Sequence, residues 1–318
     1  MYYPYFRGKQ YELITIRESA PLLMKAGFRP IIEPVKEDLN GLQKALDAII
    51  EAGGRAIVII NPQDGELSGR GRSEELAGLL KAKLSLSESI SAGILLNSHV
   101  PLAEVTALSR IHAAQNPVLI HAGFIEAKPL ASSLGALTKA QTHVFLNESS
   151  GGKLYQKHFK GAFRVLVRDG FKRRPLNKDY PDLEPFSDLH VTFPEEGMDG
   201  FGDFLIVGSE YSDTGGIPYV LAIHLTFIDP DQDDSMQIYH FKSKTHITQK
   251  DPAGKFAEAL AKMMAVLDAP GSKVLETAAV KEFRDLYKRK HFPGLGYIKK
   301  LSMSHHIETL ARYFENAG

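Results

Sequence analysis

Polar side chains follow many of the short apolar runs in the sequence, and these side chains are the candidates for chemistry. They comprise acids, amides, histidines, one arginine and one serine, namely Glu33, Asn61, Asn97, His121, Asn147, Glu148, Arg168, Asp169, Ser209 and His224. If the apolar runs are strands of a parallel barrel, the residues that follow them gather at one mouth, where barrel active sites lie. We therefore predict a site there. The alternative is that strand ends contact water and carry polar residues for that reason alone.

Glu33 is the strongest single candidate. It lies between Ile31-Ile32 and Pro34-Val35, and a carboxylate in such an apolar context is costly to bury unless it is paired, protonated or bound to a ligand. If the protein is a barrel enzyme, Glu33 would act as the general base or as a metal ligand. The alternative is a structural ion pair, for which Arg168 and Arg17 are the expected partners.

His121 and His224 are the other two candidate catalytic residues, because both occur within apolar runs. With a carboxylate such as Glu33 or Asp203 they could form a metal site. However, the sequence has no His-x-His pair on a strand and no His-Glu-x-x-His motif. A lone histidine in a strand is also more often a hydrogen-bonded core residue. We predict no metal site, and the sequence does not indicate a cofactor.

Two basic segments indicate an anionic ligand. Ser68–Ser73 contains Arg70 and Arg72 between glycines and opens an expected helix, where backbone N–H groups and the helix dipole favour an anion. Lys172 and Arg173 follow the strand that ends at Arg168. We predict that these side chains, together with Asn61, Asn97 and Asn147, contact a phosphate-like group or nucleic acid. Solvated loops are the alternative.

Composition excludes several classes of protein. Among the 318 residues, 43% are hydrophobic and 24% are charged, which is typical of a globular chain. Lys+Arg and Asp+Glu are balanced at 38 each, which excludes a globally basic nucleic-acid coat. The absence of cysteine excludes disulfides, thiolate metal ligands and a thiol nucleophile. No apolar run has the length of a membrane span, so we predict a cytoplasmic protein without a membrane partner.

The elements that must position these residues alternate between strand and helix from residue 27 to about 169. Apolar β-branched runs are separated by segments of helical spacing, and such alternation favours a parallel sheet. The expected strands are Phe28–Val35, Arg55–Ile60, Ile94–Leu96, Val118–Ile120, Thr142–Leu146 and Phe163–Val167. No Gly-x-Gly-x-x-Gly motif follows the first of them, so a dinucleotide-binding sheet is not supported. We predict an α/β fold of the (β/α)8 TIM-barrel type.

The second half of the barrel is expected to be irregular. Further strands are predicted at Phe204–Val207, Val220–Phe227 and Gln237–Phe241, after a long functional or mobile loop over residues 170–200. Helices are predicted at 252–267, 273–289 and 297–314. We therefore predict a barrel domain over residues 1–250. Residues 251–318 would form a C-terminal helical segment that packs on the barrel or completes it.

The N-terminal segment is unusually aromatic, with Tyr2, Tyr3, Tyr5 and Phe6 followed by Arg7. We expect the aromatic rings to fill the bottom of the barrel or to pack on the C-terminal helices. Stacking on nucleic-acid bases is the alternative. Arg7 is kept as a candidate ligand contact.

Several segments together carry a resemblance to a known family. They are Met1–Leu13, Gly202-Asp203-Phe204, Ala222-Ile223-His224-Leu225, Tyr239-His240-Phe241, and Gly294-Leu295-Gly296 through His305-His306. In these the sequence resembles the phage-type beta protein family of bacteria and phages. Members are commonly found beside a predicted nuclease of the restriction-endonuclease-like class. The resemblance therefore implies a component of a phage-defence or mobile-element conflict system with a nuclease partner, and it implies no particular reaction.

Three functions remain. The first is an accessory or regulatory barrel protein that works with the nuclease. The second is a barrel hydrolase acting on a phosphorylated or nucleotide-like substrate, in which Glu33, His121, Arg168 and His224 converge on one pocket and Arg168 binds the anion. The third is a nucleic-acid sensor, which requires a continuous basic stripe. Whether the protein is an enzyme stays open at this point.

Overall fold

The computed structural model describes residues 1–68, 74–86, 88–113, 116–147, 151–213, 216, 218–244 and 248–317. The chain divides into two compact units. The barrel unit comprises Met1–Asp169 and Thr192–Phe204, and the second unit comprises Gly170–Val191 and Leu205–Gly318. None of the helices in the described part of the chain is both long and apolar enough to span a membrane.

An eight-stranded parallel sheet forms the barrel unit, which confirms the predicted TIM-like barrel. Its strands, in spatial order, are β1 Tyr5–Phe6, β2 Ile31–Ile32, β3 Ala56–Ile59, β4 Ile90–Leu96, β5 Val118–His121, β6 Thr142–Leu146, β7 Phe163–Val167 and β9 Gly200–Gly202. The two edges of the sheet meet at the N-terminal segment. The N–H of Tyr3 donates to the Phe201 carbonyl at 2.8 Å and that of Tyr5 donates to the Asp203 carbonyl at 2.9 Å. These bonds join β1 to β9 and close the sheet.

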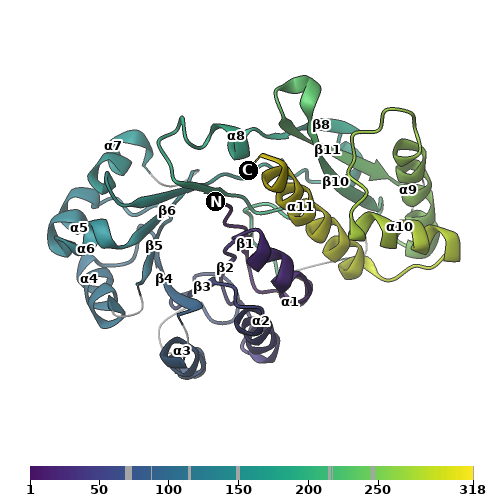
Figure 1. Cartoon of the computed structure of the whole chain (residues 1–318). Coiled ribbons are helices and arrows are strands. Elements are labelled where there is room, and N and C mark those ends of the chain that lie inside the picture. The colour runs from purple at the N-terminus through teal and green to yellow at the C-terminus, as the bar shows by residue number, and fades with distance from the viewer. Residues whose placement is uncertain are drawn as a thin grey trace. The chain divides into compact units, whose positions relative to one another are not determined.

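Helices surround the barrel strands on the outside (Figure 1). They are α1 Gln10–Lys25, α2 Asn40–Glu51, α3 Glu74–Leu86, α4 Leu102–Ile111, α5 Ala127–Leu134, α6 Leu137–Ala140 and α7 Gly152–Gln156, with the short 3-10 helix η2 Lys157–Phe159. Alternate strand residues point inward and form a buried core of Tyr3, Tyr5, Ile31, Ile57, Ile59, Leu95, Val118, Ile120, Val144, Val165, Val167 and Phe204. Two of the N-terminal aromatic residues, Tyr3 and Tyr5, therefore fill the barrel interior.

Gly202 lies at the closure of the barrel, where another backbone approaches closely. A Cβ atom at this position would lie 2.2 Å from the carbonyl oxygen of Tyr3. We therefore expect Gly202→Ala to lower the free energy of unfolding by about 3 kcal/mol, because a backbone clash cannot be relieved by rotating a side chain. Urea denaturation measured by circular dichroism tests this. The matched control is Gly78→Ala in α3, where nothing lies within 4 Å, and which should be neutral or stabilising. Equal effects of the two substitutions would contradict the prediction.

The second unit contains a three-stranded antiparallel sheet in the order β10 Ala222–Asp229, β11 Ser235–Lys242 and β8 Leu183–Ser187. Its other elements are α9 Pro252–Leu267, α10 Ala278–Arg289 and α11 Leu295–Ala317, with the short helices η3 Asn177–Asp179 and η4 Pro230–Gln232; the chain passes from this unit back to the barrel unit within α8 Leu189–Thr192. Side chains of β10, β11, α9, α10 and α11 share one apolar core. The three C-terminal helices are thus found where helical spacing predicts them.

Three predictions about the second half of the barrel are wrong. Val220–Phe227 and Gln237–Phe241 do contain strands, but these pair antiparallel with each other in the second unit. Phe204–Val207 is not a strand, and β1 and β9 supply the missing barrel strands instead. The segment 170–200 is not one long loop, since it contains β8 and α8. The division into two units also differs from the expected boundary at residue 250.

Candidate functional site

The two-residue period of the strands decides which of the predicted residues face the barrel mouth. Tyr5, Ile31, Ile59, Leu95 and Val167 point into the barrel core. Side chains two positions further along continue on the same side of each strand. This phase places Arg7, Glu33, Asn61, Asn97 and Asp169 at the carboxyl ends of β1, β2, β3, β4 and β7. Four of them belong to the predicted strand-end set, and Arg7 is the candidate ligand contact of the N-terminal segment.

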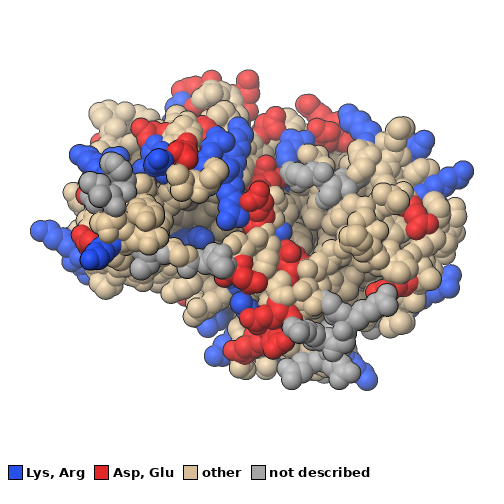
Figure 2. Space-filling model, turned by 180° about the vertical axis from the view of Figure 1, so that it is seen from behind, with Lys and Arg blue, Asp and Glu red and all other residues tan. Residues whose placement is uncertain are grey.

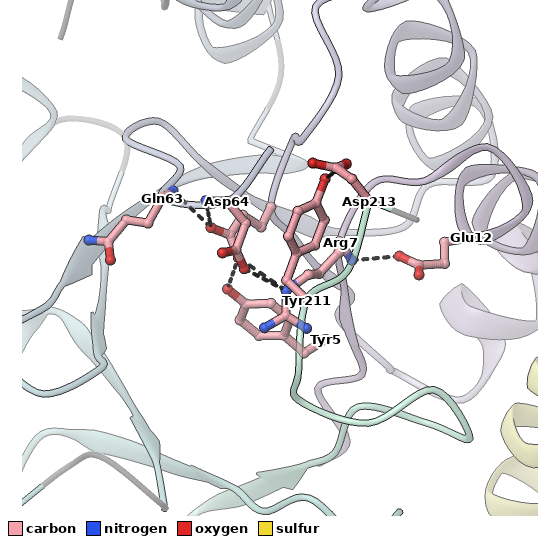
Figure 3. A network of polar contacts seen from close by, with 8 residues as sticks. Tyr5, Arg7, Glu12, Gln63, Asp64, Tyr211 and Asp213 are labelled. Carbon is pink, nitrogen blue, oxygen red and sulfur yellow. Dashed lines mark hydrogen bonds and ion pairs between the residues drawn. The ribbon is translucent and has the colours of Figure 1, made fainter. Parts of the chain in front are cut away.

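Glu33 is 2% exposed, and its carboxylate has several partners, among them Tyr5, Gln63 and Asp64, which are labelled in Figure 3. The Tyr5 hydroxyl donates to Oε2 at 2.7 Å. The backbone N–H groups of Gln63 and Asp64 donate to Oε1 at 2.9 and 3.3 Å. Arg7 Nε lies 3.9 Å from Oε2. The arginine beside Glu33 is therefore Arg7, and not the expected Arg168 or Arg17.

Arg7 connects Glu33 to a second carboxylate. Its Nε donates to Asp64 Oδ2 at 2.9 Å, and its guanidinium carbon lies 5.5 Å from the centre of the Phe204 ring. The backbone N–H of Arg7 donates to Glu12 Oε2 at 2.6 Å. The Asp64 side chain is 32% exposed, whereas that of Glu33 is 3% exposed. Asp64 is therefore the carboxylate that a ligand can reach.

Tyr5 holds the other side of the Glu33 carboxylate. Burial, followed by the neighbouring negative charge of Glu33, raises the pKa of the Tyr5 hydroxyl well above its usual value. The hydroxyl therefore keeps its proton at neutral pH and acts only as a donor to Glu33. This makes Tyr5 a fixed support of the carboxylate and not a base.

Asn61 and Asn97 shape the loops at the mouth. The Asn61 amide donates to the Leu95 carbonyl at 2.9 Å and accepts from the Leu95 N–H at 2.8 Å, which extends the pairing of β3 with β4. Asn97 Oδ1 accepts from two backbone N–H groups of its own loop, and its amide nitrogen donates to Gln63 Oε1. Both asparagines thus position the segment that carries Gln63 and Asp64.

His121 lies outside the barrel interior, because Ile120 occupies the inward phase of β5. It is fully buried, with Nδ1 2.7 Å from the Tyr155 hydroxyl and Nε2 3.0 Å from His143 Nδ1. His143 Nε2 in turn donates to the Thr138 carbonyl at 2.8 Å. Burial lowers the pKa of His121 well below its usual value and that of His143 to about 4. His121 is thus a hydrogen-bonded core residue, as the alternative interpretation holds.

The remaining candidates are dispersed. Arg168 and Asn147 each come one position after an inward-facing residue, so their side chains lie on the other face of the strand from those at the mouth. Arg168 pairs with Glu196 at 3.2 Å, and Asn147 is exposed. Lys172, Arg173, Ser209 and His224 belong to the second unit. Arg70, Arg72 and Glu148 lie outside the described residues. Within the barrel unit, Glu33, His121 and Arg168 therefore do not converge on one pocket as the hydrolase hypothesis requires, and His224 belongs to the second unit. Within the described ranges, no three or more His, Asp or Glu residues are grouped so that they could hold a metal ion.

Sequence reasoning missed Asp64 and Gln63. Both lie in the run Asn61-Pro62-Gln63-Asp64-Gly65, a polar turn directly after β3. Their position in a polar turn after an apolar strand is the available signal, although the strand-end pattern itself points only to Asn61. In the structure, it is the loop beyond that residue that returns to Glu33.

Comparison with models of protein families and with curated proteins finds no match. Among solved structures, the chain is similar to a point mutant of an O-GlcNAc hydrolase from Thermobaculum terrenum, with 15% identity and a TM-score of 0.39. The similarity covers 64% of this chain and 54% of that one, so the match spans about half the length of that protein. The resemblance to the phage-type beta protein family stays a prediction.

Proposed function

We propose that the barrel unit is a hydrolase whose substrate is a small, uncharged, hydroxyl-rich molecule. The observation that carries this proposal is the position of Arg7 between two carboxylates, Glu33 and Asp64, at the carboxyl ends of the barrel strands. One positive and two negative side chains leave this cluster negatively charged, and negative charge repels phosphorylated ligands. Carboxylate and amide groups, in contrast, form hydrogen bonds with hydroxyl groups.

Asp64 is the proton acceptor in the proposed reaction. Its exposed carboxylate takes a proton from the attacking water molecule, which is general base catalysis. Arg7 fixes the direction of that carboxylate through Nε. Glu33 is buried and acts as a positioning residue, because it holds both Arg7 and the backbone of the Gln63–Asp64 loop. This replaces the predicted role of Glu33 as the base itself.

Substitution of Asp64 tests the proposal. The full chain would be assayed against nitrophenyl glycosides and unmodified nucleosides, and we expect turnover of at least one of these classes. Asp64→Asn should then lower kcat by about 10²–10⁴-fold, because the amide cannot accept the proton.

Glu66→Gln is the matched control. Glu66 lies on the same loop, and its side chain is 45% exposed and pairs with Lys36 at 2.8 Å. Loss of this exposed pair should leave kcat close to the wild-type value. An Asp64→Asn protein with unchanged kcat would contradict the proposed role, and absence of turnover of every substrate would contradict the proposed function.

The two other predicted functions have weaker support. Association with a nuclease in a conflict system stays a prediction from the family resemblance. A nucleic-acid sensor requires a basic stripe, but on the face seen in Figure 2 the Lys and Arg side chains are interspersed with Asp and Glu side chains. No observation on the described residues favours either function over the hydrolase.

A further inference from the structure

The second unit contains a chain of four polar side chains that the barrel chemistry does not use. Arg174 Nη2 donates to Glu184 Oε2 at 2.9 Å. Glu184 Oε1 lies 3.1 Å from His240 Nε2. His240 Nδ1 lies 2.7 Å from His224 Nδ1. The chain runs across the antiparallel sheet from β8 through β11 to β10.

Hydrogen-bonding rules determine the protons on the two rings. The Glu184 carboxylate is already bound by Arg174 and accepts, so His240 Nε2 carries a hydrogen. A single hydrogen lies between the two Nδ1 atoms. If it belonged to His240, that ring would be a cation, although it is 1% exposed. Burial lowers the pKa of His240 to about 4, so at neutral pH the shared hydrogen belongs to His224.

The consequence is a lone pair on His224 Nε2. His224 is also neutral, since burial and the nearby His240 hold its pKa well below the usual value. With its proton on Nδ1, a neutral imidazole is an acceptor at Nε2. Among the described residues, Nε2 of His224 has no hydrogen-bond partner, and the side chain is only partly buried.

Two aromatic rings pack against the His224 imidazole. The Phe171 ring centre lies 4.9 Å away and the Tyr180 ring centre 5.0 Å away, both edge to face. Phe171 and Tyr180 are 7% and 4% exposed, so His224 is flanked by two buried apolar rings, and the charged Lys299 also acts on it and lowers its pKa further. An apolar surrounding suits an uncharged ligand.

We propose that His224 is a nucleophile at a second site of this chain, and that this site accepts acyl groups from small, uncharged carboxylic esters. In catalytic triads, one group orients a second group, which in turn orients or activates the nucleophile. Glu184, His240 and His224 are arranged in this way. Glu184 and His240 are positioning residues here, because they act only through His224. This inference is independent of the hydrolase proposed for the barrel unit.

The acyl transfer can be written with p-nitrophenyl acetate as the substrate. Nε2 of His224 forms a bond to the acetyl carbon, and the ester C–O bond breaks as p-nitrophenolate leaves with the electron pair. The Nδ1 proton of the acylated ring passes to His240 Nδ1 as the Nε2 proton of His240 moves to Glu184. Water then hydrolyses the acetylimidazole to acetate and its two protons pass to solvent, while the relayed protons return from Glu184 to His240 Nε2 and from His240 Nδ1 to His224 Nδ1.

Release of p-nitrophenolate by the full chain tests the proposal. We expect His224→Gln to lower the rate by about 10-fold or more, because the nucleophile is lost. The matched control is His291→Gln, which removes an exposed histidine of the same unit and should leave the rate within a factor of about two of the wild type. A folded His224→Gln protein with the wild-type rate would overturn the proposal.

Two measurements on the unaltered protein do not depend on whether a variant folds. Diethyl pyrocarbonate acylates neutral imidazole, so peptide mass spectrometry should find His224 modified at least as fast as His291. His224 unmodified after complete modification of His291 would overturn the proposal. Long-range ¹⁵N NMR spectra should show the Nδ1–H tautomer for His224 and the Nε2–H tautomer for His240; the Nε2–H tautomer at His224 would overturn it as well.

Discussion

Glu33→Ala is expected to lower the free energy of unfolding by about 3–5 kcal/mol, the range typical of removing one partner from a buried charged network. The substitution removes the acceptor of the Tyr5 hydroxyl and of the Gln63 and Asp64 backbone N–H groups. Buried donors without acceptors are strongly destabilising. Urea denaturation followed by circular dichroism measures the effect.

Glu33→Gln separates hydrogen bonding from charge. Its amide oxygen can accept from the two backbone N–H groups, and the Tyr5 hydroxyl can rotate to accept from the amide nitrogen. We therefore expect Glu33→Gln to lower the free energy of unfolding by less than half as much as Glu33→Ala does. Glu66→Ala, at an exposed position on the neighbouring loop, should change stability by about 0.5 kcal/mol or less. If Glu33→Ala were no more destabilising than Glu66→Ala, the network around Glu33 would not stabilise the barrel.

Acidification from pH 7 to pH 4 is the second change with a large expected effect. Burial lowers the pKa of His143, in the barrel unit, and that of His305, in the second unit, to about 4. In the unfolded chain a histidine has a pKa of about 6.5. Between these two values the unfolded state binds more protons than the folded state, so stability is lost as the pH falls. The stability contributed by these neutral buried histidines is fully present above pH 6.5 and decreases as the pH falls toward 4. Below pH 4 these two groups cause no further loss.

The size of the effect follows from the pKa difference. A shift from about 6.5 to about 4 corresponds to roughly 3 kcal/mol for one histidine. Calorimetry at pH 7, 6, 5 and 4 should show a melting temperature that begins to fall below pH 6.5, before most carboxylates titrate. His305→Gln should reduce this dependence in the second unit, and His291→Gln, at an exposed position, should not. A melting temperature that is the same at pH 7 and pH 4.5 would contradict the prediction.

The sequence by itself determined the class of fold. Continuous apolar runs such as Thr142–Leu146 and Phe163–Val167 are strands with the predicted bounds, because strands buried on both faces require apolar residues throughout. The helix Pro252–Leu267 also has its predicted bounds, since its apolar stripe and its N-terminal proline are local signals. The unusual context of Glu33 correctly indicated a buried carboxylate with partners.

Only the tertiary structure decided which residues share the site. β1 is two residues long and β9 is Gly200–Gly202; neither is long enough to show a periodic apolar pattern in the sequence. His121, Asn147 and Arg168 follow inward-facing residues by one position, and a shift of one residue turns a side chain to the other face of a strand. The contact of the Gln63–Asp64 loop with Glu33 joins residues about 30 positions apart. Local sequence carries no record of such a distant pairing, so Asp64 could be recognised only once the barrel had brought it beside Arg7.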